Sequence, residues 1–516
     1  MSTVTLLSAG ILGIDAFPIH VEVDIGHGLP GWSTVGLPES AVRESKDRVI
    51  AAIHNCGYEF PFHRITLNLA PADVKKQGTA YDLPIALGLL AASGVVDPRG
   101  LEGFALLGEL SLHGKLRPVR GALAVALLAK QQGWKSLILP RENAPEAALI
   151  EGLDVRSASD LPAVVEFLQG QKDLPVAVRA PLSSTEPSTS PDFSEVKGQA
   201  YAKRALEIAA AGFHPAMMVG PPGSGKSLLA STLPSILTEL SFEESLVTSR
   251  IHALCQDKPI EGGLMRSRPF RSPHHSVSEA GLIGGGSWPR PGEVSLAHHG
   301  VLFLDELPEF RRPSLETLRQ PLENHSVTIV RARQRMTFPA RFLLVAAMNP
   351  CPCGKFGQAK DRCFCPSVAI QRYQSRISGP LLDRFDLKVE VPPLDFQELS
   401  AAEPAESGAR VRARVAQAQE RQRLRLGPLG LLANSQMRNQ QLRRFCELKG
   451  EAMRLLERAV AKWELSARAY HRILKVSRTI ADLEGVEEIS AAHVGEAVAY
   501  RCPEDNRGQI PQASAL

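Results

Sequence analysis

The stretch Gly220-Pro221-Pro222-Gly223-Ser224-Gly225-Lys226-Ser227 matches the pattern G-x-x-x-x-G-K-[ST] of a phosphate-binding loop at every fixed position. The apolar run at residues 216–219 predicts a buried parallel strand before it, and residues 228–230 begin a helix-forming segment after it. The glycines let backbone N–H groups turn inward around phosphates, and the helix N-terminus adds positive potential. We therefore predict an ATP site in which Lys226 contacts the β- and γ-phosphates and Ser227 binds Mg²⁺.

Two downstream strands end in the polar groups that such a site needs. The apolar run at 301–304 ends in Asp305 and Glu306, about 80 residues after the loop. Asp305 is predicted to hold the Mg²⁺ shell, and Glu306 to orient and deprotonate the attacking water. A third apolar run at 342–348 ends in Asn349, which resembles sensor 1 of AAA+ ATPases and would contact the γ-phosphate or the water. The alternative for Asn349 is turn initiation before Pro350.

Arginines are the remaining catalytic candidates, because charge develops on the γ-phosphate during its transfer. The segment 378–386 resembles the arginine-finger segment of magnesium-chelatase and MCM-type AAA+ proteins, which makes Arg384 the candidate finger and Arg376 the fallback. A surface arginine in a salt bridge is the alternative. The segment 465–472 resembles the sensor 2 motif of the lid, with Arg468 reaching the nucleotide and Arg472, one turn on, as the alternative.

Upstream of the ATP site, strand-like and helix-like runs alternate over residues 1–175 and predict an α/β or α+β domain. Residues 176–194, rich in Ser, Thr and Pro, read as a linker. The order of segments resembles the proteolytic domain of Lon-type proteases, through residues 36–38, 41–45, 78–86, 107–110 and 114–121. That resemblance implies a Ser–Lys dyad. Its two positions fall on Asp82 and Ala124, so we expect binding or assembly instead of proteolysis.

Taken together, the motifs resemble the magnesium-chelatase-related AAA+ ATPases of the YifB/ComM type from about residue 4 to about residue 505. The most specific segments are 268–275, Arg-Pro-Phe-Arg-Ser-Pro-His-His, and 284–293. The resemblance implies an α/β fold class: a Lon-protease-like, non-proteolytic α+β domain at 1–175, then an AAA+ P-loop NTPase core with pore inserts at 195–395. A helical lid follows at 396–506, and a disordered tail at 507–516.

Two basic features suggest a nucleic-acid partner. Residues 325–338 read as a hairpin in which period-two spacing places Arg331, Arg333 and Arg335 on one side, suited to a phosphate backbone in a ring channel. A solvated basic hairpin without a partner is the alternative. Residues 410–478 hold 17 Lys and Arg against 5 Asp and Glu, a local excess of 12, although the whole chain is only +4. Such concentration favours a polyanion.

Four of the eight cysteines form a cluster, Cys351-Pro-Cys353 and Cys363-Phe-Cys365. Paired C-x-C elements could close a tetrahedral thiolate site for structural zinc, with uncoordinated thiols as the alternative. The other four cysteines are scattered, as in a reducing cytoplasm. No apolar run approaches the length of a transmembrane helix, so no membrane association is expected.

The leading hypothesis is an oligomeric ring ATPase, six subunits being the expected number, that acts on single-stranded or branched DNA as a helicase or branch-migration motor. The resemblance implies a role in integrating DNA during natural transformation, with a recombination protein as a candidate partner of the N-terminal domain. One alternative is a motor that remodels a protein or drives metal insertion, as in magnesium chelatase. Another is a nucleotide-gated scaffold, against which the complete set of catalytic residues argues.

Overall fold

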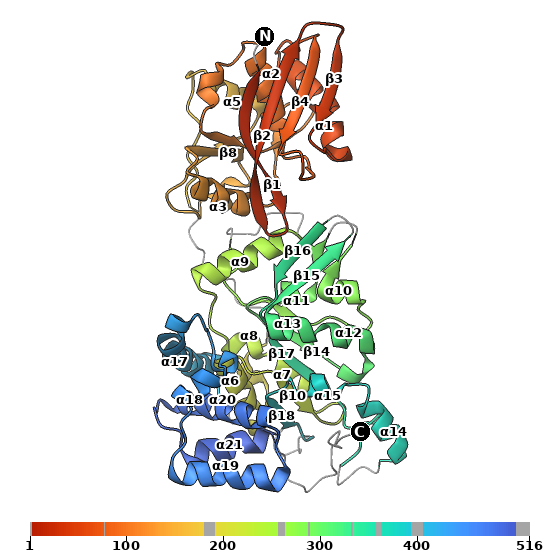
Figure 1. Ribbon diagram of the computed structural model, residues 1–516, viewed down its shortest axis with the longest axis vertical. Helices are drawn as coiled ribbons and strands as arrows, with labels where there is room; N and C mark the ends of the chain where they lie inside the picture. The colour runs from red at the N-terminus through yellow and green to blue at the C-terminus, as the bar shows by residue number, and fades with distance from the viewer. Residues whose placement is uncertain are drawn as a thin grey trace. The chain divides into compact units, whose positions relative to one another are not determined.

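A computed structural model describes residues 3–76, 78–179, 191–255, 264–286, 289–331, 334–357, 363–393 and 406–501 of the chain (Figure 1). The chain divides into two compact units. Unit 1 comprises Met1–Ser184 with Phe242–Met265 and Ala332–Phe338, and unit 2 comprises Thr185–Ser241, Arg266–Arg331 and Pro339–Leu516. In the part of the chain that is described, no helix has the length and apolar character needed to cross a bilayer.

Unit 1 is built on a seven-stranded mixed sheet in the order β3-β4-β2-β1-β5-β8-β9. The β1–β2 and β2–β4 pairs are antiparallel, and the other four pairs are parallel. Its strands are β1 (Val4–Leu12), β2 (Asp15–Gly26), β3 (Gly31–Val35), β4 (Arg64–Ala70), β5 (Phe104–Leu106), β8 (Ser136–Pro140) and β9 (Asp154–Ala158), with β6 (Glu109–Leu110) and β7 (Leu116–Arg117) as a separate small ribbon. Its helices are α1 (Ser40–Asn55), α2 (Asp82–Ala92), α3 (Ala122–Gln132), α4 (Ala144–Ala147), α5 (Leu161–Leu168) and α9 (Phe242–Ala253).

The two ends of this sheet are covered differently, as the residue patterns dictate. In β4 the buried residues alternate with half-exposed ones, so only the face that packs on α1 and α2 is covered. All five residues of β8 are buried, because α5 belongs to the core on one face and α3 and α4 belong to the core on the other. Leu246 of α9 and Leu264 join the α3 core, so the segment 242–265 packs within unit 1 although it lies far along the chain.

Unit 2 contains a five-stranded parallel sheet in the order β11-β14-β17-β10-β18. Its strands are β10 (Ala216–Val219), β11 (Phe270–Arg271), β14 (Val301–Leu304), β17 (Leu343–Met348) and β18 (Leu387–Glu390). The chain also forms two-stranded sheets, one from β12 (Gly284–Gly285) and β13 (Arg290–Pro291) and one from β15 (Ser326–Arg331) and β16 (Gln334–Pro339), the latter strand lying mostly within the unit 1 residues. The helices around the sheet are α6 (Ala200–Gly212), α7 (Lys226–Ser231), α8 (Leu233–Ile236), α10 (Glu279–Ile283), α11 (Glu293–Leu296), α12 (Arg312–Thr317), α13 (Arg319–Asn324), α14 (Ser367–Gln374) and α15 (Gly379–Leu382).

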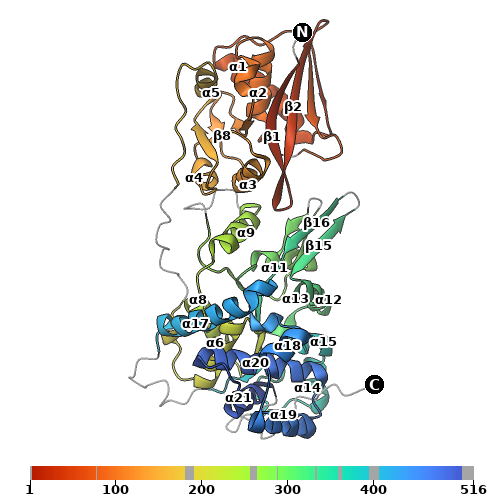
Figure 2. The ribbon, with the colours of Figure 1, turned by 60° about the vertical axis from the view of Figure 1, so that its left-hand side comes forward.

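The C-terminal helices form a lid that shares its hydrophobic core with this sheet. They are α17 (Gly408–Leu426), α18 (Asn439–Phe445), α19 (Gly450–Trp463), α20 (Ala467–Glu484) and α21 (Ala491–Arg501). Figure 2 shows them gathered beside α6, against which α17 and α20 pack. Val411 and Val415 of α17 lie in one continuous apolar cluster with α6 and β10, so core and lid belong to the same unit.

The predicted linker and tail lie largely outside the described residues. Part of the linker, however, belongs to unit 1: Val176 bridges to Arg156, and the N–H of Ala177 donates to the carbonyl of Val155. The glycine-rich segment from 281 begins within α10, where Leu282 is buried, and continues into the β12–β13 ribbon.

Candidate active site

Parallel strands bring the three predicted catalytic segments to one edge of the sheet in unit 2. In the register, Val219 pairs with Met348 and Leu304 pairs with Ala346, so β10, β14 and β17 end at nearly the same level. Ligands of open α/β sheets bind beyond the carboxyl ends of the strands. The phosphate-binding loop after β10, Asp305 after β14 and Asn349 after β17 therefore lie together, as the sequence predicts.

The phosphate-binding loop has the backbone that its glycines allow. Gly223 and Gly225 adopt φ of 76° and 86°, left-handed values that a side chain disfavours. A Cβ at Gly220 would lie 2.2 Å from the carbonyl oxygen of Val391, so this position also requires glycine. The side-chain amide of Gln199 donates to Pro392 O at 2.6 Å and to Ser224 O at 3.4 Å, which joins the loop to the segment after β18.

Lys226 is buried, and its ammonium group is hydrogen-bonded to the backbone of this loop. Its Nζ donates to the carbonyls of Gly220 at 2.8 Å and Pro221 at 2.7 Å, and lies 3.3 Å from Oδ1 of Asn349. Burial lowers the pKa of Lys226, while the charges of Asp305 and Glu306 act in the opposite direction. Lys226, the predicted phosphate contact, and Asn349, the predicted sensor, thus lie next to each other.

Ser227 and Asp305 fit a magnesium ion, the metal that an ATP site implies. The Ser227 hydroxyl donates to Oδ2 of Asp305 at 2.5 Å, and Oδ1 of Asp305 accepts the N–H of Glu306 at 2.9 Å. A hydroxyl and a carboxylate are the hard oxygen donors that Mg²⁺ takes, with water and nucleotide phosphates completing the shell. An Mg²⁺ ion would bind where the Ser227 hydroxyl and the Asp305 carboxylate now contact each other.

Glu306 has an unusual backbone and a partner that the sequence did not suggest. It adopts φ 50° and ψ 48°, the left-handed region, directly after the buried strand β14. Nδ1 of His275 lies 3.5 Å from Oε2 of Glu306. His275 belongs to the segment 268–275, which the sequence marks as family-specific, but no spacing rule assigns it a chemical role. Since β11 pairs with β14, the residues that follow β11 are brought toward Glu306.

The four arginine candidates have different surroundings. Arg384 pairs with Glu323, and its buried Nε has no hydrogen-bond partner among the described residues. Burial and the like charges of Arg468 and Arg319 lower its pKa, so Arg384 and Arg468 lie in one positive cluster. Arg468 itself is exposed at the start of α20. The two fallbacks are engaged elsewhere: Arg376 with Glu309 at 2.9 Å, and the buried Arg472 with Asp386 at 3.3 Å.

The four clustered cysteines lie close together in space, and the first of them, Cys351, follows Asn349 by two residues along the chain. All four Sγ atoms lie within 4.8 Å of one another. The Sγ of Cys351 is 3.4 Å from that of Cys353 and 3.7 Å from that of Cys363, and Cys353 to Cys363 is 3.6 Å. Tetrahedral bonds of 2.3 Å separate neighbouring sulfurs by about 3.8 Å. The donor set and spacing therefore fit a tetrahedral thiolate metal site.

The predicted DNA-contacting arginines are only partly described. Arg333 lies outside the described residues, and so does the side chain of Arg331. On β16, Arg335 and Thr337 are exposed, whereas Met336 and Phe338 are buried. For Arg335, the period-two spacing thus places the guanidinium on the outer side of its strand.

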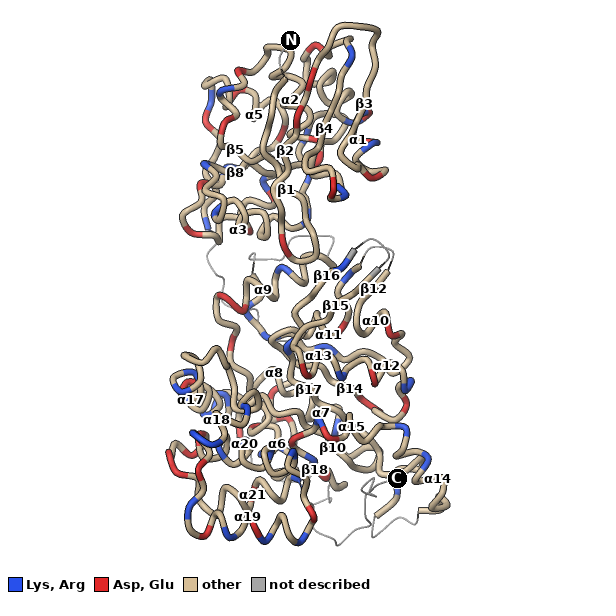
Figure 3. The backbone as a smooth tube through the Cα atoms, in the orientation of Figure 1, with Lys and Arg blue, Asp and Glu red and all other residues tan. Residues whose placement is uncertain are grey.

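Most arginines of the lid helix α17 have partners in the same chain, although Arg412, Arg421 and Arg423 remain exposed. Figure 3 shows acidic and basic residues interspersed along the lid helices. Partners of the α17 arginines are Ser235 O for Arg412, Glu207 and Glu406 for Arg414, Gly485 O for Arg421, Glu420 for Arg423 and Asp482 for Arg425. The charge excess counted from the sequence is therefore a weaker argument for a polyanion than its size suggests.

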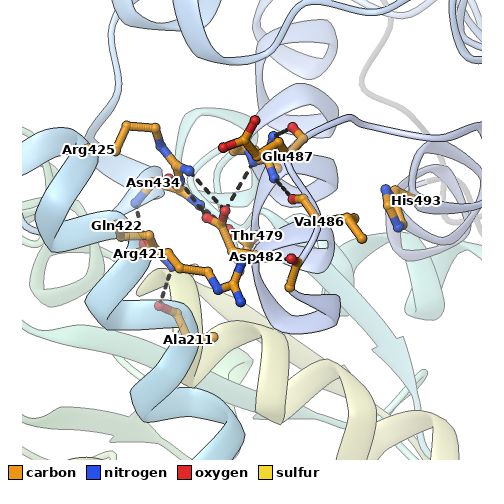
Figure 4. Close-up of polar contacts among 12 residues, drawn as sticks. Ala211, Arg421, Gln422, Arg425, Asn434, Thr479, Asp482, Val486, Glu487 and His493 are labelled. Carbon is orange, nitrogen blue, oxygen red and sulfur yellow. Dashed lines mark hydrogen bonds and ion pairs between the residues drawn. The ribbon is translucent and has the colours of Figure 1, made fainter.

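One such partner, Asp482, is the centre of a buried network in the lid. Arg425 contacts both its oxygens, at 2.9 and 2.5 Å, and the amide of Asn434 donates to it at 2.8 Å (Figure 4). Gln422, on the same helix as Arg425, donates to Ala211 O of α6 at 3.0 Å. These contacts fix α17 between α20 and α6: the ion pair joins two lid helices, and the Gln422 amide joins the lid to the core.

In unit 1, the two positions aligned with a Ser–Lys dyad hold groups of another kind. Asp82 is buried at the start of α2, bonded by Arg48 at 2.8 and 3.0 Å and by the N–H of Leu110 at 3.2 Å. Burial raises the pKa of Asp82 to about 6, against the opposing effect of Arg48. Ala124 is buried in α3. Neither position therefore holds the serine hydroxyl or the lysine amine of the dyad.

A parallel sheet in this order, a phosphate loop on β10, and carboxylates and an amide at the neighbouring strand ends define an AAA+-type ATPase that uses ATP and Mg²⁺. Profiles of the magnesium chelatase subunit ChlI match residues 192–399 and 21–143, and the profile of its C-terminal part matches residues 405–501. The chain belongs to the magnesium-chelatase-related family that includes the competence protein ComM and YifB, which confirms the resemblance inferred from the motifs.

Full-length relatives support this membership. The competence protein ComM of Haemophilus influenzae is 45% identical over 505 residues, covering 97% of this chain and 98% of that protein. The protein YifB of Salmonella typhimurium is 46% identical over 502 residues, covering 97% of each. The Lon protease of Mycolicibacterium smegmatis is 21% identical over 166 residues, 30% of this chain and 21% of that protein, in agreement with a Lon-like N-terminal region.

Proposed function

We propose that the chain is a subunit of a ring-forming AAA+ motor that couples ATP hydrolysis to movement on DNA. The separation of its catalytic groups carries the proposal. The negative charges of Asp305 and Glu306 act to raise the pKa of Lys226 against the effect of burial. Burial and the positive charges of Arg468 and Arg319 lower the pKa of Arg384. Arg384 thus lies among other positive charges, with Glu323 as its partner. A finger placed in this way serves the nucleotide of a neighbouring subunit, which makes hydrolysis depend on assembly.

The relatives favour DNA as the substrate of this motor. A protein named for competence is 45% identical along nearly the whole chain, and competence is the uptake of DNA. The exposed Arg335 on β16 would contact a phosphate backbone, together with Arg331 and Arg333. We propose a hexamer that acts in the cytoplasm as a helicase or branch-migration motor during natural transformation. The N-terminal unit would bind a recombination protein.

A second candidate is a motor that remodels a protein or drives metal insertion. The matches to magnesium chelatase subunit ChlI over three segments favour it. The two candidates differ in what stimulates hydrolysis, because a DNA motor hydrolyses ATP faster on DNA.

We also propose that the thiolate site formed by Cys351, Cys353, Cys363 and Cys365 binds a structural Zn²⁺ ion. The supporting observations are four thiols within 4.8 Å and sulfur separations close to those of a tetrahedral zinc site. No water-activating position is needed, since all four ligands come from the protein. The metal content of the purified protein, compared with that of a Cys353→Ser variant, tests this assignment.

The DNA proposal is tested by the steady-state ATPase rate of the full chain with and without branched and single-stranded DNA. We expect stimulation by DNA, strand displacement that requires ATP, and the loss of both in Lys226→Ala. A triple alanine variant at Arg331, Arg333 and Arg335 should bind DNA more weakly while keeping its DNA-free ATPase rate. Absence of stimulation, with unchanged DNA affinity in the triple variant, would favour the remodelling motor.

A further inference from the structure

The proposed zinc loop packs directly against the phosphate-binding loop. Gly354, between the two pairs of cysteines, adopts φ 77°, and a Cβ at this position would lie 2.2 Å from Cδ of Pro222. The backbone of the zinc loop therefore rests against the second proline of the phosphate-binding motif. Because the contact is with backbone and a rigid ring, neither partner can move away without moving its loop.

The other end of the zinc loop is joined to Asn349. Cys351 follows Asn349 by two residues and is fully buried. Its carbonyl accepts the N–H of Gly354 at 2.9 Å, and its Sγ accepts the N–H of Phe356 at 3.3 Å. The same side chain that offers a metal ligand thus orders the turn that carries Gly354. Amide donors to thiolate sulfur are typical outer contacts of a metal site.

The second pair of cysteines ties the loop to α14. Cys365 lies two residues before α14, and Gln374 near the end of that helix donates to Pro350 O at 3.1 Å. A metal ion bound by all four thiolates would therefore close a ring. The ring runs from Cys351 through the metal to Cys365, along α14 to Gln374, and back to the carbonyl of Pro350. Metal–thiolate bonds would add to the hydrogen bonds that Cys351 makes to Gly354 and Phe356 and would strengthen the hold of the loop against Pro222.

We propose that the tetrathiolate zinc site is a positioning element for ATP hydrolysis: it holds the phosphate-binding loop at Pro222 and the sensor at Asn349 in register. This inference rests on the proposed zinc and ATPase functions and adds the coupling between them. The thiolates do not touch nucleotide, so their role is indirect. Loss of the metal leaves the Lys226 and Ser227 side chains intact but releases the backbone that places them.

The experiment follows zinc and hydrolysis together in the full-length protein. An organomercurial titrates the thiolates while a chromogenic chelator reports released zinc, and kcat and the KM for ATP are measured at each step. We expect one zinc per chain, and a fall in kcat of about 10- to 100-fold that parallels its release. The Cys255→Ser variant, which removes an exposed cysteine outside the cluster, should release the same amount of zinc and lose kcat to the same extent as wild type.

A second variant separates the metal from the contact. Gly354→Ala places a methyl group against Pro222 but leaves all four thiolates, so zinc content should be retained while kcat falls or the KM for ATP rises. Gly430→Ala is its control, because Gly430 has a similar φ of 71° in the lid and nothing within 4 Å of an added Cβ. Full zinc release with kcat and KM within about twofold of wild type would overturn the coupling. A wild-type protein without zinc would overturn the metal assignment and leave the ATPase untouched.

Discussion

Nδ1 of His275 lies 3.5 Å from Oε2 of Glu306, the carboxylate predicted to deprotonate the attacking water. The His275 ring stacks on His274 at 4.0 Å and meets the edge of Phe310 at 6.4 Å, so its position is set by neighbours on both sides. Since Glu306 has left-handed backbone dihedrals and an exposed side chain, little else fixes its carboxylate. His275 is therefore a candidate positioning residue.

We predict that His275→Ala lowers kcat about 10-fold with little change in the KM for ATP, because the carboxylate loses its orienting contact but the nucleotide contacts remain. His275→Asn should recover much of the loss, since its amide nitrogen can occupy the position of Nδ1. His54→Ala is the control, because it removes an exposed imidazole at the end of α1, outside the nucleotide site. Equal kcat values for the alanine and asparagine variants would count against positioning.

The roles of Lys226 and Glu306 predict different losses. Glu306→Gln should bind ATP with near wild-type affinity and hydrolyse it about 10²- to 10⁴-fold more slowly, because only the base is removed. Lys226→Ala should lose ATP affinity as well, since the buried ammonium is predicted to contact the phosphates. Fluorescent-nucleotide titration and single-turnover hydrolysis separate the two effects. A Glu306→Gln variant that hydrolyses ATP at the wild-type rate would remove Glu306 from the mechanism.

Much of the nucleotide site could be predicted from sequence because its residues follow buried strands. Asp305 and Asn349 each end an apolar run, and parallel strands necessarily bring such ends to one edge of a sheet. The cysteine cluster was equally visible, because two short C-x-C elements bring all four thiols within reach once the intervening chain turns back. In both cases local spacing implies proximity.

The remaining features depend on tertiary packing, which no local spacing encodes. His275 meets Glu306 only because β11 lies next to β14, and Gly354 meets Pro222 only because the zinc loop folds back over the phosphate loop. The partners of the lid arginines depend on packing in the same way. A count of arginines cannot show that Arg425 faces the buried Asp482 and not solvent.

Asp386 predicts how stability depends on pH. It is buried between core and lid, 2.8 Å from Nδ1 of His214 and 3.3 Å from Arg472. Burial acts to raise its pKa, but the bond to His214 and the charges of His214, Arg472 and Lys475 outweigh burial and hold the pKa below its usual value. A depressed carboxyl pKa contributes stability above the unfolded value, about 4, and loses it as pH falls through the lower folded value.

Asp386→Asn should therefore lower the free energy of unfolding by about 3–5 kcal/mol at pH 7, because it leaves buried positive charge unpaired. The difference from wild type should stay constant down to about pH 5 and shrink below about pH 4. Urea denaturation at several pH values measures it. Asp383→Asn is the control: Asp383 pairs with Arg501 at 3.3 Å but is 45% exposed, so its loss should cost less than about 1 kcal/mol. A pH-independent difference would contradict the assignment.

Arg384 gives a test of whether hydrolysis is shared between subunits. Arg384→Ala should lower the ATPase rate by about 10³-fold or more while ATP affinity stays near wild type, because a finger acts on the transition state. Lys226→Ala should be inactive for the opposite reason: its own site is empty, but its Arg384 is intact. Where a Lys226→Ala subunit presents its Arg384 to an Arg384→Ala neighbour, one complete active site forms.

Mixing the two inactive variants under conditions that allow subunits to exchange should therefore restore ATPase activity. With random mixing at equal concentrations, about a quarter of the interfaces pair an intact site with an intact finger. Arg376→Ala mixed with Lys226→Ala provides the comparison, since Arg376 pairs with Glu309 of its own chain. If Arg384 serves its own nucleotide, the mixture of Arg384→Ala and Lys226→Ala regains no activity, because each of its subunits then lacks one group of its own site. Recovery in the Arg384 mixture would place the finger across the subunit boundary.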